Sequence, residues 1–128
     1  MKLTAKIISK CTIACMIWLC ASFAAVADDR FIEGFPDIPY LDILAAVVGE
    51  PVIFDTASGT VAEVGLQFSE PVATVLTIYS QALVGLGWQC TNTDAYLRCT
   101  REQSVIQLTA PNGKNVTAPF ILRLEPRQ

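Results

Sequence analysis

The clearest periodic pattern in the chain lies between Ser69 and Trp88. Apolar side chains recur there every three or four residues, which is the spacing of one face of an α-helix. They are Val72, Val75, Leu76, Tyr79, Leu83 and Leu86. Ser69 is expected to cap the first turn, and Gly85 or Gly87 to end the helix in the left-handed conformation. The pattern predicts one helix with its apolar face in the core, and a ligand groove along that face is the alternative.

Two segments before this helix have the pattern of β-strands. Residues 51–55 form a short apolar run, and residues 60–68 alternate apolar and polar side chains, so one face of the second strand is expected to be buried. Residues 56–59 join the two segments as a hairpin turn, in which Gly59 is free to adopt a positive φ.

Turn residues divide the chain after the helix into short apolar segments. The segments expected to form strands are residues 88–91, 96–101, 105–109 and 116–124. The first two are expected to form a hairpin, and Pro119 marks a bulge or an edge position in the last one. We write the order of elements as ββαβββ, which is a single small α+β domain with one helix packed on an antiparallel sheet.

Residues 28–50 are acidic and apolar at the same time. We expect residues 28–35 to be mobile and a short helical turn at residues 40–47. We interpret residues 28–50 as an N-terminal arm that packs over a domain of residues 51–128. The alternative is that this arm docks a partner, which makes Tyr40 and Leu41 candidate binding residues.

The N-terminus has the parts of a Sec-type signal peptide. Three lysines precede an uncharged apolar run at residues 11–24, and a small-x-small cleavage pattern ends at Ala27. The run is shorter than the about 20 apolar residues of a membrane span, although an uncleaved anchor is the alternative. A lipoprotein is disfavoured because bulky residues precede Cys20. We therefore expect residues 1–27 to be removed, and the remaining chain to be periplasmic without a membrane span.

Removal of this peptide changes the charge and the cysteine count. The 128-residue chain has net charge −3, and loss of three lysines leaves six basic and twelve acidic residues, net −6. Nucleic acid is therefore not an expected partner. About 101 residues remain, which suffices for one small domain.

Two of the five cysteines remain after cleavage, Cys90 and Cys99. If Thr93 faces Tyr96 in the hairpin, the two cysteines lie directly opposite each other, close enough for a disulfide. An even pair in an exported chain favours this bond. A metal site is the alternative, but two cysteines without any histidine are a poor ligand set.

Three motifs resemble a group of small exported proteins of alphaproteobacteria. They are V-I-F-D-T-A-S-G-T-V-A-E-V, V-L-T-I-Y-S-Q-A-L-V-G-L-G-W and Y-L-R-C-T-R-E, preceded by D-I-P-Y-L-D-I-L. The resemblance covers about residues 35–110. It implies an exported α+β domain and carries no particular activity. The cysteine pair is not part of the shared pattern.

The residues that most enzymes use are scarce in this chain. It has no histidine, which excludes Ser-His and Cys-His pairs, and it has no glycine-rich phosphate loop. Asp55 and Glu63 lie on the two arms of the first hairpin and are candidates for general acid–base catalysis. The favoured alternative is that Asp55 caps the turn and Glu63 is solvated. Arg98 and Arg101 are expected to be surface charges and not an anion site.

We therefore expect a non-enzymatic periplasmic module that contacts another envelope protein and has no catalytic residues, metal or cofactor. The alternative is a small-molecule or lipid-binding domain that uses the gap between helix and sheet. Trp88 follows the helix and is expected to pack over its last turn. If that gap binds a ligand, Trp88 is a candidate binding residue.

Overall fold

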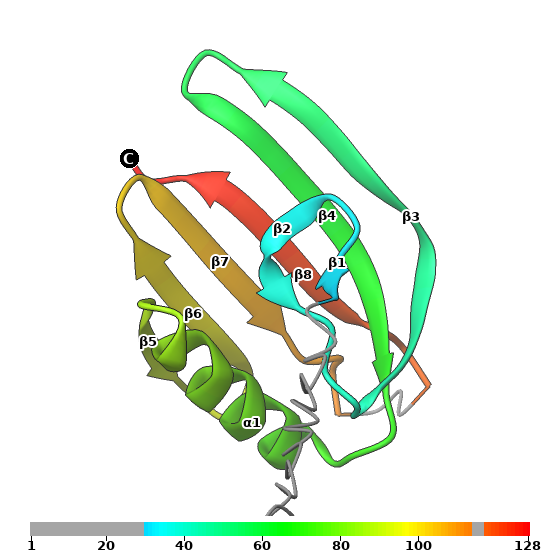
Figure 1. Cartoon of the computed structure of the whole chain (residues 1–128). Helices are drawn as coiled ribbons and strands as arrows, with labels where there is room; N and C mark the ends of the chain where they lie inside the picture. The colour runs from blue at the N-terminus through cyan, green and yellow to red at the C-terminus, as the bar shows by residue number, and fades with distance from the viewer. Residues whose placement is uncertain (1–29, 114–116) are drawn as a thin grey trace, which may run out of the picture.

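One helix lies across a six-stranded antiparallel sheet in the computed structural model, which describes residues 30–113 and 117–128 (Figure 1). The sheet has the strand order β3-β4-β8-β7-β6-β5, and the helix is α1 (Val72–Gly85). The strands are β3 (Leu44–Thr56), β4 (Gly59–Phe68), β5 (Gln89–Asn92), β6 (Tyr96–Arg101), β7 (Ser104–Thr109) and β8 (Phe120–Pro126). The α+β prediction is confirmed, whereas the predicted signal peptide, residues 1–27, lies outside the described residues.

The predicted order ββαβββ differs from the observed one. Two further strands, β1 (Phe31–Ile32) and β2 (Phe35–Pro39), form a separate hairpin before the sheet begins. Four strands follow the helix, because each of the four segments predicted there forms a strand of its own. The predicted order therefore lacks one strand after the helix and two strands before it.

The core lies between one face of the sheet and α1. Four of the six apolar helix positions are buried, namely Val75, Leu76, Tyr79 and Leu83. Facing them are the inward side chains of the strands, which are Ala62, Val64, Leu66, Leu97, Ile106, Leu108 and Leu122. Leu86 is 45% exposed because the helix ends one residue before it. Burial of each such aliphatic side chain contributes about 1.5–3 kcal/mol, so this layer supplies most of the stability.

The start of α1 differs from the prediction, and its end agrees with it. Pro71 occupies the N-cap position without a side-chain cap, so the predicted N-cap at Ser69 is wrong. The chain at Ser69 is instead tied to the start of the sheet, since its amide donates to the Ile43 carbonyl at 3.2 Å. At the other end Gly87 has φ +94°, and the Trp88 amide donates to the Leu83 carbonyl at 3.0 Å. This is the Schellman arrangement that a glycine permits.

The segment predicted as a mobile arm contributes to the core. Ile32, Phe35 and Ile38 of the β1–β2 hairpin are each at most 1% exposed, so the described part of residues 28–35 is packed. The predicted helical turn at residues 40–47 is wrong, because β3 already begins at Leu44. Its valines are β-branched and suit a strand that pairs with β4. Strand β3 therefore runs across the predicted domain boundary at residue 50.

Two predicted hairpins are confirmed. Thr56 pairs with Gly59 at the β3–β4 turn, where Gly59 has φ +137°. Cys90 pairs with Cys99 between β5 and β6, and the two form a disulfide with a Cα–Cα distance of 4.0 Å.

The last strand begins later than predicted. Strand β8 starts at Phe120, directly after Pro119, so this proline marks neither a bulge nor an edge. The physical reason is that β8 lies between β4 and β7, and a proline has no amide to donate within an interior strand.

Candidate functional site

The two faces of the sheet differ in what covers them. Helix α1 and the β1–β2 hairpin lie on the same face (Figure 1). Within the described chain nothing packs over the other face, which we call the open face. Its side chains are those that alternate with the core residues along each strand. They include Glu63 on β4, Arg123 on β8, Gln107 on β7 and Arg98 on β6.

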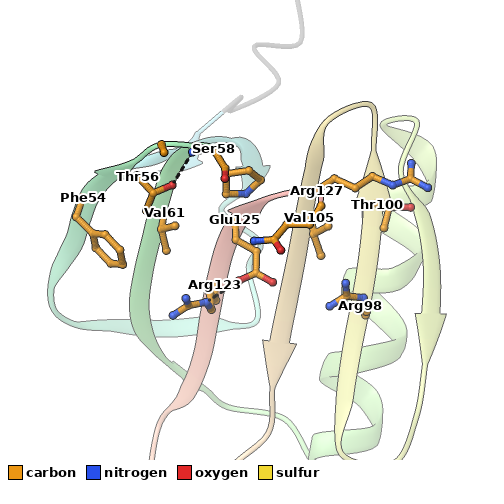
Figure 2. Close-up of a pocket in the computed structure, with 13 residues that line it drawn as sticks. Phe54, Thr56, Ser58, Val61, Arg98, Thr100, Val105, Arg123, Glu125 and Arg127 are labelled. Atoms are coloured by element: carbon orange, nitrogen blue, oxygen red, sulfur yellow. Dashed lines mark hydrogen bonds and ion pairs between the residues drawn. The ribbon is translucent and has the colours of Figure 1, made fainter.

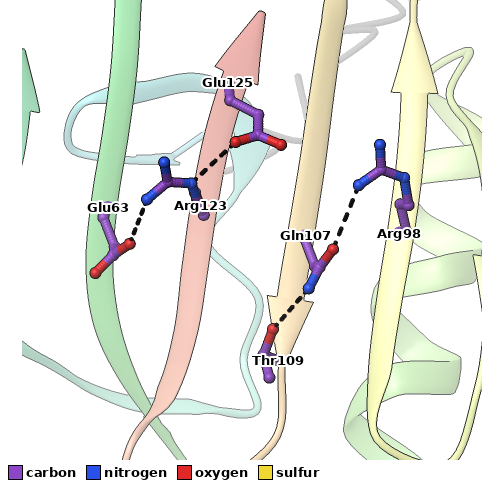
Figure 3. Close-up of polar contacts among 6 residues, drawn as sticks. All are labelled: Glu63, Arg98, Gln107, Thr109, Arg123 and Glu125. Carbon is purple, nitrogen blue, oxygen red and sulfur yellow. Dashed lines mark hydrogen bonds and ion pairs between the residues drawn. The ribbon is translucent and has the colours of Figure 1, made fainter. Parts of the chain in front are cut away.

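These polar residues stand side by side across four neighbouring strands, as Figure 3 shows. The Arg123 guanidinium pairs with Glu63 at 2.9 Å and with Glu125 at 3.0 Å. Hydrogen bonds to Glu125 and then to Glu63 hold the pKa of Arg123 above its ordinary value. Arg98 donates to the neutral Gln107 side chain at 3.4 Å. The ion pairs are half-exposed, so they contribute little to stability but fix the direction of Arg123.

A cavity of about 800 Å³ lies at one end of the open face, beside the β3–β4 turn. Phe54 and Val61 line one side of it (Figure 2). Its other lining residues include Arg98, Arg123, Glu125 and Arg127. Val105 also lines it and is 2% exposed. The cavity therefore combines an apolar wall with several guanidinium groups.

Strand β3 forms a long edge of the sheet. It has 13 residues and pairs only with β4 among the described strands, so the backbone groups on its outer side have no strand partner there. Its exposed apolar residues are Val47, Val48, Val52, Ile53 and Phe54, which are 36–62% exposed. The pairing with β4 is irregular between Val48 and Val52, where Pro51 also lacks an amide donor. The regular part next to the turn is therefore residues 52–56.

The three predicted binding residues lie elsewhere. Tyr40 and Leu41 are half-buried against the core, and the Arg30 guanidinium lies 5.1 Å from the centre of the Tyr40 ring. Trp88 is 3% exposed at the end of α1, as expected for a residue that packs over the last turn. None of the three lines the cavity on the open face.

Arg101 has a structural role that the sequence pattern did not indicate. Its guanidinium lies 4.5 Å from the centre of the Trp88 ring, donates to the Leu86 carbonyl at 3.1 Å and pairs with Asp37 at 2.8 Å. It therefore links β6 to the helix end and to β2. The prediction of a simple surface charge is wrong for this residue, because the ring of Trp88 offers its face to a cation.

The two candidate carboxylates are not a pair. Asp55 accepts a hydrogen bond from the Thr60 hydroxyl at 2.8 Å, whereas Glu63 binds Arg123. Thr60 and Glu63 are three residues apart on one strand, so their side chains point to opposite faces. The turn is capped by Thr56, whose hydroxyl accepts from the Ser58 amide at 3.2 Å, and not by Asp55.

The gap between helix and sheet, where a ligand was the alternative, is filled by buried side chains. Tyr79 is 1% exposed there, and its hydroxyl donates to the Pro39 carbonyl at 3.2 Å. Burial raises the pKa of Tyr79 to about 12. This site is therefore part of the core, and the cavity lies on the opposite face.

No group of three or more potential metal ligands occurs among the described residues. In the same part of the chain no helix is long and apolar enough to span a membrane. Comparison of the chain with protein-family models, with curated proteins and with solved structures gives no match.

Proposed function

We propose that this protein is a non-enzymatic module of the bacterial cell envelope that binds another protein through the outer edge of β3. The observation that carries this proposal is the length and apolar character of that edge. An edge strand presents a row of free amides and carbonyls, to which an extended segment of a partner adds as a further strand. The opposite edge, β5, has only four residues and its exposed ones are polar.

Residues 52–56 are the part of β3 best suited to this contact. They continue without irregularity into the hairpin turn, and Val52, Ile53 and Phe54 are 45–62% exposed. Because side chains alternate along the strand, apolar surface is available on both faces of the edge. A partner strand with apolar side chains would bury this surface and satisfy the free backbone groups.

The proposed location is the periplasm, after removal of residues 1–27. The Cys90–Cys99 disulfide supports it, because such bonds persist in oxidising compartments. The resemblance to exported proteins of alphaproteobacteria supports it as well. Intact mass measured on protein from a bacterial periplasm is expected to correspond to a chain beginning at Asp28. A full-length species embedded in the membrane would contradict the proposed export.

The contact is tested with a photo-crosslinking amino acid placed at single positions of the full chain in living cells. At Val52 we expect a discrete crosslinked product with another envelope protein. At Thr91, on the opposite edge strand, we expect none. A Val52→Lys change adds charge to the edge and should abolish the crosslink from Phe54, whereas Val84→Lys on the exposed side of α1 should not. Equal crosslinking at Thr91, or none at Val52, would refute the β3 contact.

A further inference from the structure

The cavity on the open face collects positive charge in a chain that is acidic overall. Three of the five arginines line it, namely Arg98, Arg123 and Arg127. Arg123 is neutralised by its two glutamates. Arg98 and Arg127 have no carboxylate within ion-pair distance among the residues that the structure describes. These two guanidinium groups are therefore available to an anion.

The cavity is apolar at one end and cationic at the other. Phe54 and Val61 lie to the left in Figure 2, and the guanidinium groups of Arg98 and Arg127 lie to the right, with β8 between them. Val61 is 5% exposed although it faces the open side of the sheet, whereas Phe54 beside it is 45% exposed and offers apolar surface to a ligand. A ligand that fills this space needs an anionic group and an apolar body.

We propose that the cavity binds a small alkyl carboxylate with a single negative charge. Glu63 and Glu125 already pair with Arg123, whereas Arg98 and Arg127 have no side-chain carboxylate partner in the described chain. The side chains that line the cavity can therefore accept one anionic group. A dianion would be repelled by Glu125, which itself lines the cavity. A carboxylate matches the planar fork of a guanidinium group.

The volume and position of the cavity agree with this ligand class. About 800 Å³ lies within the range of small-molecule sites and far exceeds what a simple ion fills. The site adjoins the proposed protein contact at the edge of β3 and shares Phe54 with it, but its arginines lie on other strands. Either proposal stands if the other fails.

The test is a titration of the exported, ¹⁵N-labelled protein with sodium octanoate, followed by NMR. We expect saturable shifts of the backbone amides of Val61, Arg98 and Val105. Arg98→Gln and Arg127→Gln should each weaken the affinity about tenfold, as expected for loss of a charge-assisted hydrogen bond. The control Arg30→Gln makes the same charge change outside the cavity and should leave the affinity unchanged.

The apolar wall is tested in the same way. Phe54→Ser should weaken octanoate binding about tenfold, by analogy with the loss of a buried aromatic contact. Val48→Ser is the control, because Val48 lies on the same strand with similar exposure but outside the cavity. All five substituted positions are exposed, and thermal unfolding tests whether each variant is folded.

Three results would overturn the proposal. Octanol binding as tightly as octanoate would show that the arginines do not recognise the charge. Octyl phosphate binding more tightly than octanoate at pH 8 would show that the site selects a dianion. Amide shifts confined to the β3 edge, or unaffected by Arg98→Gln, would place the ligand elsewhere.

Discussion

The two faces of this sheet are built from alternate residues of the same strands, and they obey different constraints. On β8, Leu122 points into the core and is 1% exposed, while its neighbours Ile121 and Arg123 point to the open face. The covered face consists of tightly packed apolar side chains, whereas the open face combines ion pairs and amides with a few apolar side chains around a cavity. Burial is worth about 1.5–3 kcal/mol per side chain, whereas an exposed ion pair is worth about 0–1 kcal/mol. Stability is therefore expected to depend mainly on the covered face, and side chains on the open face are less constrained by packing.

The largest loss is expected on the covered face, from Trp88→Ala. The ring closes the end of the core at α1 and holds Arg101 over it, so its removal should cost about 3–5 kcal/mol of unfolding free energy. Urea denaturation measures this cost.

In a chain that begins at Asp28, Trp88 is the only tryptophan, and its emission should be blue-shifted. The control Phe54→Ala removes a half-exposed aromatic from the other side of the molecule and should cost less than half as much. Equal losses of unfolding free energy for the two variants would show that the two faces do not differ in their contribution to stability.

The next largest effect is expected from Cys90→Ser. Removing the disulfide should cost about 2–4 kcal/mol, because the unfolded chain loses a closed loop. Wild-type protein in reducing agent is the matched control and should unfold at the same urea concentration as the variant. Thiol labelling of denatured, unreduced wild type should find no free cysteine. Two reactive thiols in the exported protein would contradict the bond.

The unfolding free energy is expected to depend on pH through Tyr79, which is buried on the covered face. Its pKa in the folded protein is about 12, against 10.0 for an ordinary tyrosine, so the folded state favours the neutral hydroxyl. Stability from this group is fully present below pH 10 and is lost as the pH rises towards 12. The unfolding free energy should fall by about 2–3 kcal/mol over that window. Tyr79→Phe cannot ionise and should lack this decrease. An identical pH slope in both proteins would show that the hydroxyl is not protected.

The smallest effect is expected on the open face, from Arg123→Gln. This change removes both ion pairs with Glu63 and Glu125, yet the partners are about 40% exposed and screened by water. The unfolding free energy should fall by no more than about 1 kcal/mol. The difference from wild type should shrink further in 1 M salt, where such pairs are screened. A loss above about 2 kcal/mol would mean that the open face also supports the fold.

The sequence predicts the parts of this fold that depend on local pattern. The helix, the β3–β4 turn at Gly59 and the register that joins Cys90 to Cys99 each follow from residues close together in the chain. The errors occur where a distant partner decides the structure. Residues 44–50 become a strand because β4 lies beside them, and Ser69 is held by Ile43 and not by the helix.

The cavity was not predicted for the same reason. Phe54 and Arg127 are far apart in sequence and meet because β8, the last strand, inserts between β4 and β7. No local pattern indicates that insertion. The only signal was the set of arginines near the end of the chain, and Arg98 was interpreted as a surface charge. Trp88, by contrast, was expected to pack over the helix end, because the glycines before it end the helix at a defined position.

The unequal edges of the sheet also limit the size of any assembly. A filament of stacked sheets needs two compatible edges on every molecule, so that each new subunit leaves a free edge for the next. Here one edge has 13 residues, whereas the other has four and is joined to its neighbour by a disulfide. Pairing at β3 uses the long edge and leaves only the short polar one. Association through this sheet is therefore expected to stop at a finite complex instead of growing into a fibre.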